Sequence, residues 1–340
     1  MTLKNENYNM LVSIIIPLHN KEQYFERCFN SVINQTYKYI ECLIVEDCST
    51  DNSHGLAENL IQNYSGNIRF VLIKHEQNSG ASVSRNTGIK NANGEYIFFL
   101  DADDVITENC INSLAALAKK YPDVDMVQGN RITRTTGEDD TIKTKKGELP
   151  EIVNGNMEIK KKYSRYIPST PWNKLVRKVF IVNNNLYFRE GITHEDTHWK
   201  IFYLKKIESF AFTGEITYIF YINPSGVMRN PNLFFSISSR LTIAEDILTN
   251  LDIDLFDQQI LMARDLLNQQ RKRIISDKKY SSLMPKCNFL LRKLPGAGFF
   301  IFLPLRLTAK KLKQGTYLIL ARVLSEKSLI TVKTFLKRGH

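Results

Sequence analysis

Four short apolar runs, separated by helical stretches, limit what this chain can fold into more than any other feature. The runs occupy residues 11–17, 40–47, 68–75 and 95–104. Most of their residues are apolar in succession rather than at alternate positions, which is typical of strands buried on both faces. Apolar residues at helical spacing lie between them, as in residues 21–35 and 109–121. Strands that alternate with helices predict an α/β fold with a mostly parallel central sheet covered on both sides.

Polar side chains follow three of these runs at the point where each run ends. The segments are PLHN (17–20), VEDCSTD (45–51) and LDADD (100–104). Ligands of open parallel sheets bind beyond the carboxyl ends of the strands. We therefore expect the three segments to meet at one crevice.

The LDADD segment contains three carboxylates, Asp101, Asp103 and Asp104. Carboxylates held together repel one another and stay charged only when a positive group is nearby. Mg2+ and Mn2+ prefer oxygen ligands and usually hold phosphate oxygens as well. Capping of a helix near residue 109 would explain one of these acids but not all three. The segment predicts a metal-bound phosphate compound, and the lack of GxxxxGK[ST] and GxGxxG patterns disfavours an ATPase or a classical dinucleotide enzyme.

Six segments follow one another in a fixed order along the first two thirds of the chain. They are VSIIIPLHN (12–20), IVEDCSTDNS (44–53), NSGASVSRNTG (78–88), FFLDADD (98–104), PWNKL (171–175) and HED (194–196). Their order and spacing resemble the family 2 glycosyltransferases over residues 11 to about 225. The resemblance implies a GT-A nucleotide-sugar-binding domain over residues 1–225. Residues 226–340 would then form a mainly helical, basic C-terminal extension.

The resemblance also implies roles for individual residues. Asp47 is similar to the acid that hydrogen-bonds the uracil ring, and His19 lies where an aromatic ring packs on that base. Asp103 would bind Mn2+ or Mg2+ directly, and Asp101 would support the metal, through a bound water, or contact the ribose. Asp196 matches the catalytic base. The other residues expected in the nucleotide-sugar site are Pro17, Asn20, Glu46, Arg85, Trp172 and Lys174.

The chain departs from the family pattern after its second apolar run. The family reads Asp-Asp-Gly where this chain has Glu46, Asp47 and Cys48. The second acid is kept, so recognition of the base is expected. The missing glycine leaves open how the following turn is shaped.

The implied activity is transfer of a hexose or N-acetylhexosamine from a UDP-sugar to a hydroxyl of a lipid-linked or growing surface polysaccharide. Such transfer passes through an oxocarbenium-like state, and an attacking hydroxyl needs a base. One base and one direct displacement invert the anomeric carbon, so an α-linked donor would give a β-linked product.

Two alternatives to this enzyme remain. One is a nucleotide-sugar-binding protein without turnover, which the intact set of acids disfavours. The other is a zinc peptidase, because HEDTH (194–198) satisfies the H-E-x-x-H pattern. That chemistry requires both histidines inside one helix, and glycine and threonine residues upstream place His194 at a junction between loop and helix.

The net charge of +11 is concentrated near the C-terminus. Residues 264–340 carry 18 Lys and Arg against 3 Asp and Glu, a net charge of +15 that leaves −4 on the rest. Together with an apolar run at 297–305, this predicts contact with an anionic membrane surface. No nucleic-acid-binding motif is present. Without a secretory signal or a run of about 18 apolar residues, the expected location is cytoplasmic, peripherally associated with the inner face of the cell membrane.

Overall fold

The computed structural model describes residues 9–135, 138–143, 149–222, 232–252 and 255–294. The chain divides into two compact units. The first contains residues 1–191 and 195–230, and the second contains residues 192–194 and 231–340. Whether residues 1–225 and 226–340 fold as independent domains stays a prediction.

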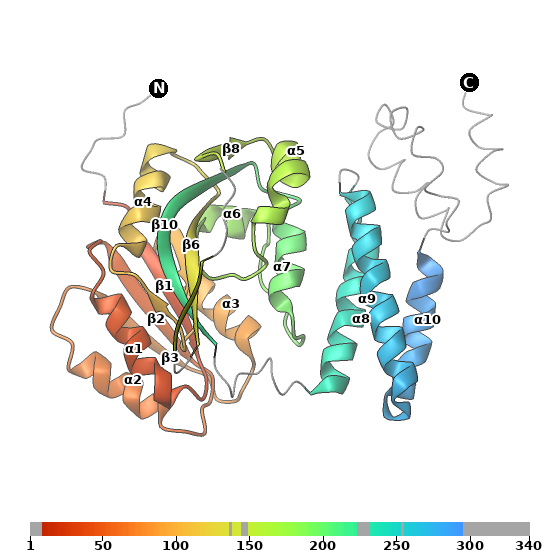
Figure 1. Ribbon diagram of the computed structural model, residues 1–340. Coiled ribbons are helices and arrows are strands. Elements are labelled where there is room, and N and C mark those ends of the chain that lie inside the picture. The colour runs from red at the N-terminus through yellow and green to blue at the C-terminus, as the bar shows by residue number, and fades with distance from the viewer. Residues whose placement is uncertain (1–8, 136–137, 144–148, 223–231, 253–254, 295–340) are drawn as a thin grey trace. The chain divides into compact units, whose positions relative to one another are not determined.

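The described part of the first unit contains ten strands in one sheet (Figure 1). They are β1 (Val12–Leu18), β2 (Ile40–Glu46), β3 (Arg69–Lys74), β4 (Tyr96–Phe99), β5 (Val105–Ile106), β6 (Met126–Thr135), β7 (Glu138–Lys143), β8 (Ile152–Asn154), β9 (Lys174–Arg177) and β10 (Ser209–Ile222). The order is β3-β2-β1-β4-β9-β6-β10-β5, with β7 beside β6 and β8 beside β10. The first four strands are parallel, as predicted, whereas β9 runs antiparallel to both of its neighbours.

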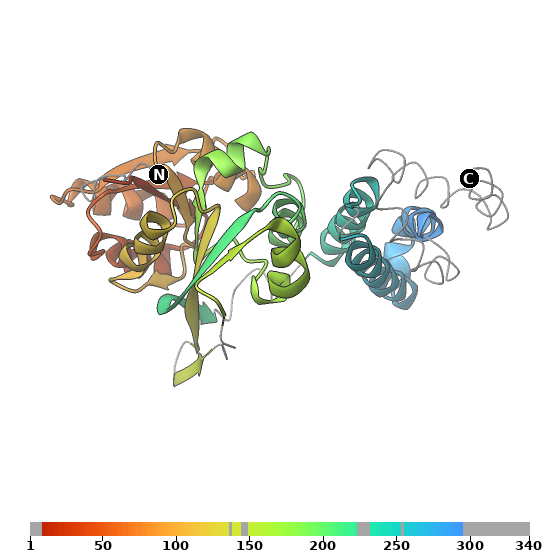
Figure 2. The same cartoon turned by 90° about the horizontal axis from the view of Figure 1, so that it is seen from above.

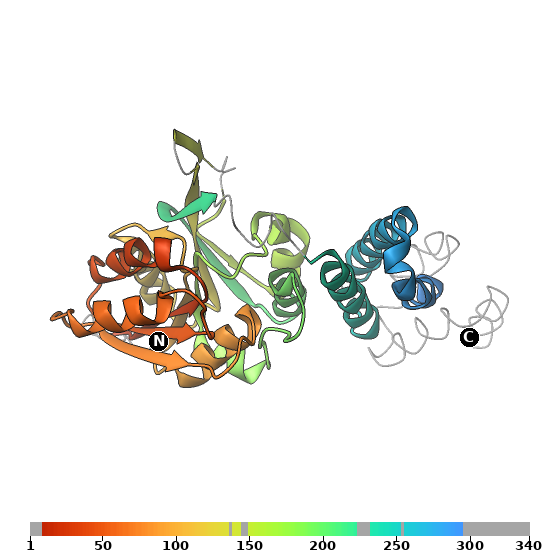
Figure 3. The same cartoon turned by 90° about the horizontal axis from the view of Figure 1, so that it is seen from below.

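Helices cover both faces of this sheet, as the views from above and below show (Figures 2 and 3). One face carries α1 (Glu22–Ile33), α2 (Ser53–Gln62) and α4 (Cys110–Lys120), whose buried side chains share one apolar core with the strands. The opposite face carries α3 (Ala81–Asn91), α6 (Lys178–Asn183) and α7 (Glu195–Tyr203). Three short segments precede β9: α5 (Asn156–Glu158), a π turn (Ile159–Tyr163) and a 3-10 turn (Ser164–Tyr166).

Two-sided coverage explains the continuous apolar runs. In β1, Ile14 and Ile16 belong to the core shared with α1, whereas Ile15 lies against Gly88 of α3. All three isoleucines are fully buried. A strand enclosed in this way needs an apolar residue at every position.

The second unit is helical. Its described elements are α8 (Leu233–Thr249), α9 (Phe256–Ser276), a 3-10 segment (Lys278–Leu283) and α10 (Met284–Lys293). These helices enclose a core of their own, in which Ile237, Leu241, Leu267 and Leu290 are buried. Among the described helices, none has the length and apolar character needed to cross a bilayer. Residues 297–305, on which the predicted membrane contact rests, lie outside the described residues.

Candidate active site

The strand register brings the predicted segments together at one edge of the sheet. Leu18 of β1 lies opposite Glu46 of β2, and Ile15 lies opposite Phe99 of β4. The turns that follow these strands therefore begin at neighbouring positions. The expected convergence of PLHN, VEDCSTD and LDADD is observed.

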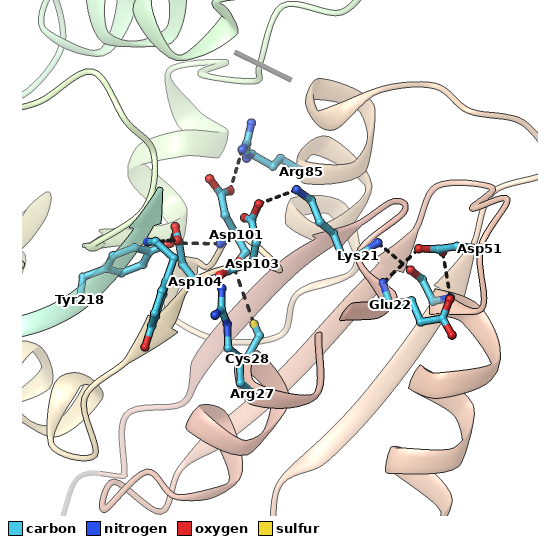
Figure 4. Close-up of polar contacts among 12 residues, drawn as sticks. Lys21, Glu22, Arg27, Cys28, Asp51, Arg85, Asp101, Asp103, Asp104 and Tyr218 are labelled. Carbon is cyan, nitrogen blue, oxygen red and sulfur yellow. Dashed lines mark hydrogen bonds and ion pairs between the residues drawn. The ribbon is translucent and has the colours of Figure 1, made fainter. Parts of the chain in front are cut away.

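Two acids of the LDADD turn face cations (Figure 4). Asp103 accepts a hydrogen bond from Lys21, with 2.5 Å between Nζ and Oδ2. Asp101 accepts one from Arg85, with 3.0 Å between Nη2 and Oδ1. Burial raises the pKa of the Asp101 carboxyl, Arg85 opposes that rise, and the charge of Asp103 adds to it. The turn thus concentrates negative charge at a partly open edge.

Asp104, the third acid, faces the interior and is 1% exposed. Its Oδ2 accepts a hydrogen bond from the Tyr218 hydroxyl at 2.7 Å, and its Oδ1 accepts one from the Tyr221 backbone N–H at 2.9 Å. Burial and the charge of Asp101 raise the pKa of Asp104 to about 8. Asp104 therefore fastens the turn to β10, and it is placed less well than Asp101 and Asp103 to contact a ligand.

Helix α1 holds the backbone of the same turn. Arg27 donates from Nη2 to the Asp103 carbonyl oxygen at 2.5 Å, and its guanidinium lies 3.8 Å from the centre of the Tyr221 ring. Sequence reasoning missed both Arg27 and Lys21. The signal for Lys21 was its position directly after the PLHN segment.

Asp47 lies inside the protein, 3% exposed, and connects β2 to the loop before α3. Its Oδ1 accepts from the Ser79 backbone N–H at 2.9 Å and lies 2.7 Å from Nδ1 of His75. Its Oδ2 accepts from the Gly80 backbone N–H at 2.7 Å. A carboxylate oxygen has capacity for more than one hydrogen bond, so the ring of a nucleobase could share these acceptors.

The turn after β2 keeps a glycine-like shape without a glycine. Cys48 has a φ of +55°, in the left-handed region. A non-glycine residue pays roughly 1–2 kcal/mol there. The Glu46 side chain accepts from the Ser49 backbone N–H at 2.5 Å, and Asn20 accepts from the Thr50 backbone N–H at 2.8 Å. The predicted binding residues Glu46 and Asn20 thus shape this turn.

The other two residues of the first segment lie beside it. His19 places Nδ1 2.9 Å from the Asp47 carbonyl oxygen and Nε2 2.9 Å from the Asn78 amide. Pro17 pairs with Val45 in the β1–β2 ladder and is half-buried. Both lie at the edge where the segments meet, and their contact with a donor stays a prediction.

Arg85 connects the LDADD turn to α7. It is 5% exposed and donates from Nη1 to Glu195 at 2.8 Å while Nη2 bonds Asp101. Its guanidinium lies 5.3 Å from the centre of the Phe188 ring. Glu195 directly precedes the predicted base Asp196, and sequence reasoning gave it no role in this site, although it forms part of the HED segment.

Asp196 lies in the first turn of α7. Its Oδ2 is 3.3 Å from the Ser169 hydroxyl, and its Oδ1 accepts from the Thr197 backbone N–H at 2.6 Å. One turn later, the fully buried Trp199 fixes the helix against β4. Its ring stacks on Phe188 with centroids 4.9 Å apart and packs edge-on against Phe99.

Trp172 and Lys174 are enclosed by neighbouring residues. Trp172 is 4% exposed and stacks on Tyr218, with ring centroids 4.4 Å apart. Lys174 is fully buried, and its Nζ donates to the Thr170 carbonyl oxygen. Both side chains are buried in this structure, and their contact with a nucleotide-sugar stays a prediction.

The HEDTH segment lacks the geometry of a zinc peptidase. Helix α7 begins at Glu195, and His194 precedes it with a φ of +63°. His198 is inside the helix and stacks on Phe202, with ring centroids 4.5 Å apart. The two histidines therefore do not share a helical face, which the peptidase chemistry requires.

The charges of the site fit a divalent cation that is held mainly by a bound phosphate compound and only partly by the protein. Asp101, Asp103 and Glu195 share two cations, Arg85 and Lys21, which leaves an excess of negative charge. The described residues contain no group of three or more His, Cys, Asp or Glu placed to hold a metal. Mg2+ and Mn2+ typically take one or two carboxylates and complete their shell with phosphate oxygens and water. Asp101 and Asp103 meet that requirement.

Comparison with known families decides what this arrangement belongs to. Residues 13–182 match the family model of glycosyl transferase family 2. The chain belongs to this family. It is 33% identical over 222 residues to the uncharacterized glycosyltransferase YibD of Escherichia coli, covering 64% of this chain and 63% of YibD. The chain thus spans a little under two thirds of that relative's length.

A shorter match has higher identity. The poly(ribitol-phosphate) beta-N-acetylglucosaminyltransferase TarP of Staphylococcus aureus is 43% identical over 112 residues, which cover 32% of this chain and 33% of TarP.

Solved structures confirm the predicted α/β GT-A fold. Residues 1–349 of S. aureus TarS in complex with UDP-GlcNAc superpose with a TM-score of 0.63 at 21% identity, covering 84% of this chain and 80% of TarS. The mannosyltransferase PcManGT of Pyrobaculum calidifontis, in complex with GDP-Man and Mn2+, gives a TM-score of 0.53 at 15% identity over 93% of this chain and 87% of that one.

Proposed function

We propose that this family 2 glycosyltransferase transfers a hexose or N-acetylhexosamine from a UDP-sugar to a polysaccharide hydroxyl with inversion. The observation that carries the proposal is the bridge made by Arg85. It joins Asp101, at the diphosphate end of the site, to Glu195, beside the base Asp196. The donor complex of TarS, with UDP-GlcNAc, and the name of TarP support a UDP-linked hexosamine as donor.

The uridine would lie over the turns after β1 and β2. Asp47 provides carboxylate oxygens to the uracil ring, and His19 provides a flat ring beside the uracil. Asn20 and Glu46 hold the intervening turn in shape through backbone N–H groups. These contacts orient the donor without taking part in bond breaking.

The diphosphate would lie against Asp101 and Asp103. These residues would hold Mn2+ or Mg2+, which supplies charge stabilisation to the departing diphosphate when bound. Lys21 already lies at Asp103 and would add a second positive charge close to the phosphates. Arg27 keeps the turn in place through the Asp103 carbonyl oxygen.

Asp196 would take the proton from the attacking hydroxyl. Ser169 and the Thr197 N–H orient its carboxylate. The attack comes from the side opposite the diphosphate, so an α-linked donor gives a β-linked product. The packing of Trp199 on Phe188 and Phe99 fixes the distance between this base and the LDADD turn.

The acceptor and the place of action belong to the same proposal. A lipid-linked saccharide or growing surface polysaccharide would present the hydroxyl at the inner face of the cell membrane. The basic residues from 264 onward would contact anionic lipid.

Two substitutions test the proposal without a known acceptor. UDP-GlcNAc hydrolysis in Mn2+ should fall at least about 100-fold in Asp196→Asn, because water also needs a base. Asp103→Asn should weaken Mn2+-dependent UDP binding at least about tenfold, whereas Asp196→Asn should leave UDP binding within about threefold. Calorimetry and a UDP-release assay measure both quantities.

The exposed Glu26 on α1 offers a matched control, since Glu26→Gln removes a carboxylate away from the turn. Near-normal hydrolysis in Asp196→Asn would refute the assignment of the base. Tight UDP binding with no hydrolysis of any UDP-sugar would favour a binding protein without turnover.

A further inference from the structure

The segment beside the proposed base is unusually basic. Residues 159–189, here called the acid-free segment, contain eight Lys and Arg and no Asp or Glu. The segment reaches the base directly, because the Ser169 hydroxyl lies 3.3 Å from Oδ2 of Asp196. A growing acceptor that approaches Asp196 would therefore meet this segment.

Lys200 lies on the same face of α7 as Asp196, four residues later. Its Nζ donates to the Ser164 carbonyl oxygen at 2.9 Å and to the Ile167 carbonyl oxygen. Both of these carbonyl groups belong to the acid-free segment. The hydrogen bonds hold the ammonium group against the segment, and it comes from the face of α7 that also carries the base.

A second buried amine, that of Lys174, lies close enough to Lys200 for the charge of Lys200 to act on it. Lys174 is fully buried and donates to the Thr170 carbonyl oxygen. Among the described residues, neither Lys174 nor Lys200 makes an ion pair with a carboxylate. Burial lowers the pKa of Lys174 well below its usual value, Lys200 and Arg131 lower it further, and Asp196 opposes them.

Burial disfavours the charged form of a lysine that only neutral carbonyl oxygens hold. Removing an ammonium group from water costs several kcal/mol unless an opposite charge compensates it. Asp196 is the carboxylate whose charge acts on Lys174, where the positive charges of Lys200 and Arg131 act as well. An incoming anion would supply the missing charge.

The acid-free segment also presents aromatic surface for a sugar ring. Tyr163 and Tyr166 have ring centroids 6.4 Å apart, and Tyr166 is 37% exposed. The guanidinium of the exposed Arg165 lies 4.8 Å from the centre of the Tyr166 ring. The flat rings offer stacking surface to a sugar ring, and Arg165 offers a positive charge to an anionic group on that sugar.

We propose that the acceptor carries a phosphate or carboxylate close to the attacked hydroxyl, and that Lys200 selects for this anion with Arg165 as an outer contact. The proposal rests on the transferase function proposed for the same site. It makes Lys200 a specificity-determining residue, next to the reaction but outside the donor site.

Binding of three labelled probes to the full chain, loaded with UDP and Mn2+, tests the proposal. The probes are a glycerol-phosphate hexamer, tetragalacturonate and neutral cellotetraose, and fluorescence anisotropy measures each Kd. At least one anionic probe should bind about tenfold or more tightly than cellotetraose. The phosphate and carboxylate probes separate the two sources of the anion.

The preference should fall about tenfold in Lys200→Gln and less in Arg165→Gln, whose exposed side chain can be replaced without disturbing the core. It should persist in Lys200→Arg. The matched control Lys90→Gln removes an exposed cation from α3 and should change nothing. Loss of affinity for all three probes in Lys200→Gln would indicate a structural role and overturn the proposal.

Equal binding of charged and neutral probes, absence of binding by both anionic probes, or a preference that survives Lys200→Gln would also overturn it. UDP-GlcNAc hydrolysis by the unaltered protein separates this failure from failure of the proposed function. If the protein hydrolyses UDP-GlcNAc but shows no preference for the anionic probes, only the proposal about the acceptor is refuted.

Discussion

The pKa of Lys200 differs between the folded and the unfolded chain, so the pH dependence of the unfolding free energy reports on how Lys200 is buried. Burial lowers its pKa to about 8, compared with about 10.4 in an unfolded chain. Below pH 8 the lysine is charged in both states, and the folded state is penalised in full. Between pH 8 and 10.4 the unfolded chain binds more protons, so the free energy of unfolding rises with pH.

Comparison with Lys200→Met isolates this effect. Allowing for solvent screening, the unfolding free energy of the unaltered protein minus that of the variant should rise by roughly 1–3 kcal/mol from pH 7 to 10.5. Urea unfolding at several pH values measures the difference. A difference that stays flat or falls with pH would show that the folded protein does not resist charging of Lys200.

At the scale of residues, the sequence identified groups that carry chemistry better than it identified their partners. Asp101 and Asp103 were placed at the site because the LDADD motif fixes them. Lys21 and Glu195 were missed, because the pairing of a cation with a distant acid depends on strand register and helix packing. The sequence left open how the turn at Cys48 is shaped without a glycine. The structure answers this with a left-handed φ at Cys48.

At the scale of elements, α3 lies unusually close to β1. A Cβ atom on Gly88 would lie 2.3 Å from Cγ2 of the buried Ile15, so an added methyl group has no space. Gly88→Ala should lower the free energy of unfolding by about 1–3 kcal/mol, even though alanine favours helix more than glycine. Guanidinium chloride unfolding measures this change.

Lys90→Ala in the same helix is the control, because Lys90 is exposed and its removal should cost little. Arg85 also lies on α3, so a displaced helix should weaken UDP binding as well. Equal or greater stability of Gly88→Ala would contradict the close approach of α3 to β1.

The first four strands and α1 to α4 were predictable because each depends on a local pattern. The expected strand at 95–104 ends earlier, as β4 (Tyr96–Phe99), because the chain turns at the LDADD segment and continues in the short β5. The antiparallel insertion of β9 between β4 and β6 was not predictable. Its direction is set by pairing with β4 residues that lie 77 to 81 positions earlier in the chain rather than by its own sequence.

At the scale of the molecule, the residues proposed to bind the donor lie in the first unit, and each unit encloses its own apolar core. The family was recognisable from the sequence because its motifs cluster in that unit. The donor sugar and acceptor were not, because the residues that select them come from segments without a shared pattern. The acid-free segment, which we propose contacts the acceptor, is one example.

This separation predicts that residues 1–230 fold without the helical unit. The fragment should unfold cooperatively and bind UDP with Mn2+ within about threefold of the full chain, because Asp47, Arg85, Asp101 and Asp103 keep their contacts. Calorimetry and thermal unfolding measure both properties. Thr193 would lose a hydrogen bond to Ser239, so any weakening should appear at α7 and affect donor hydrolysis more than UDP binding. A fragment that fails to fold, or folds but binds UDP at least tenfold more weakly, would show that the donor site depends on the second unit.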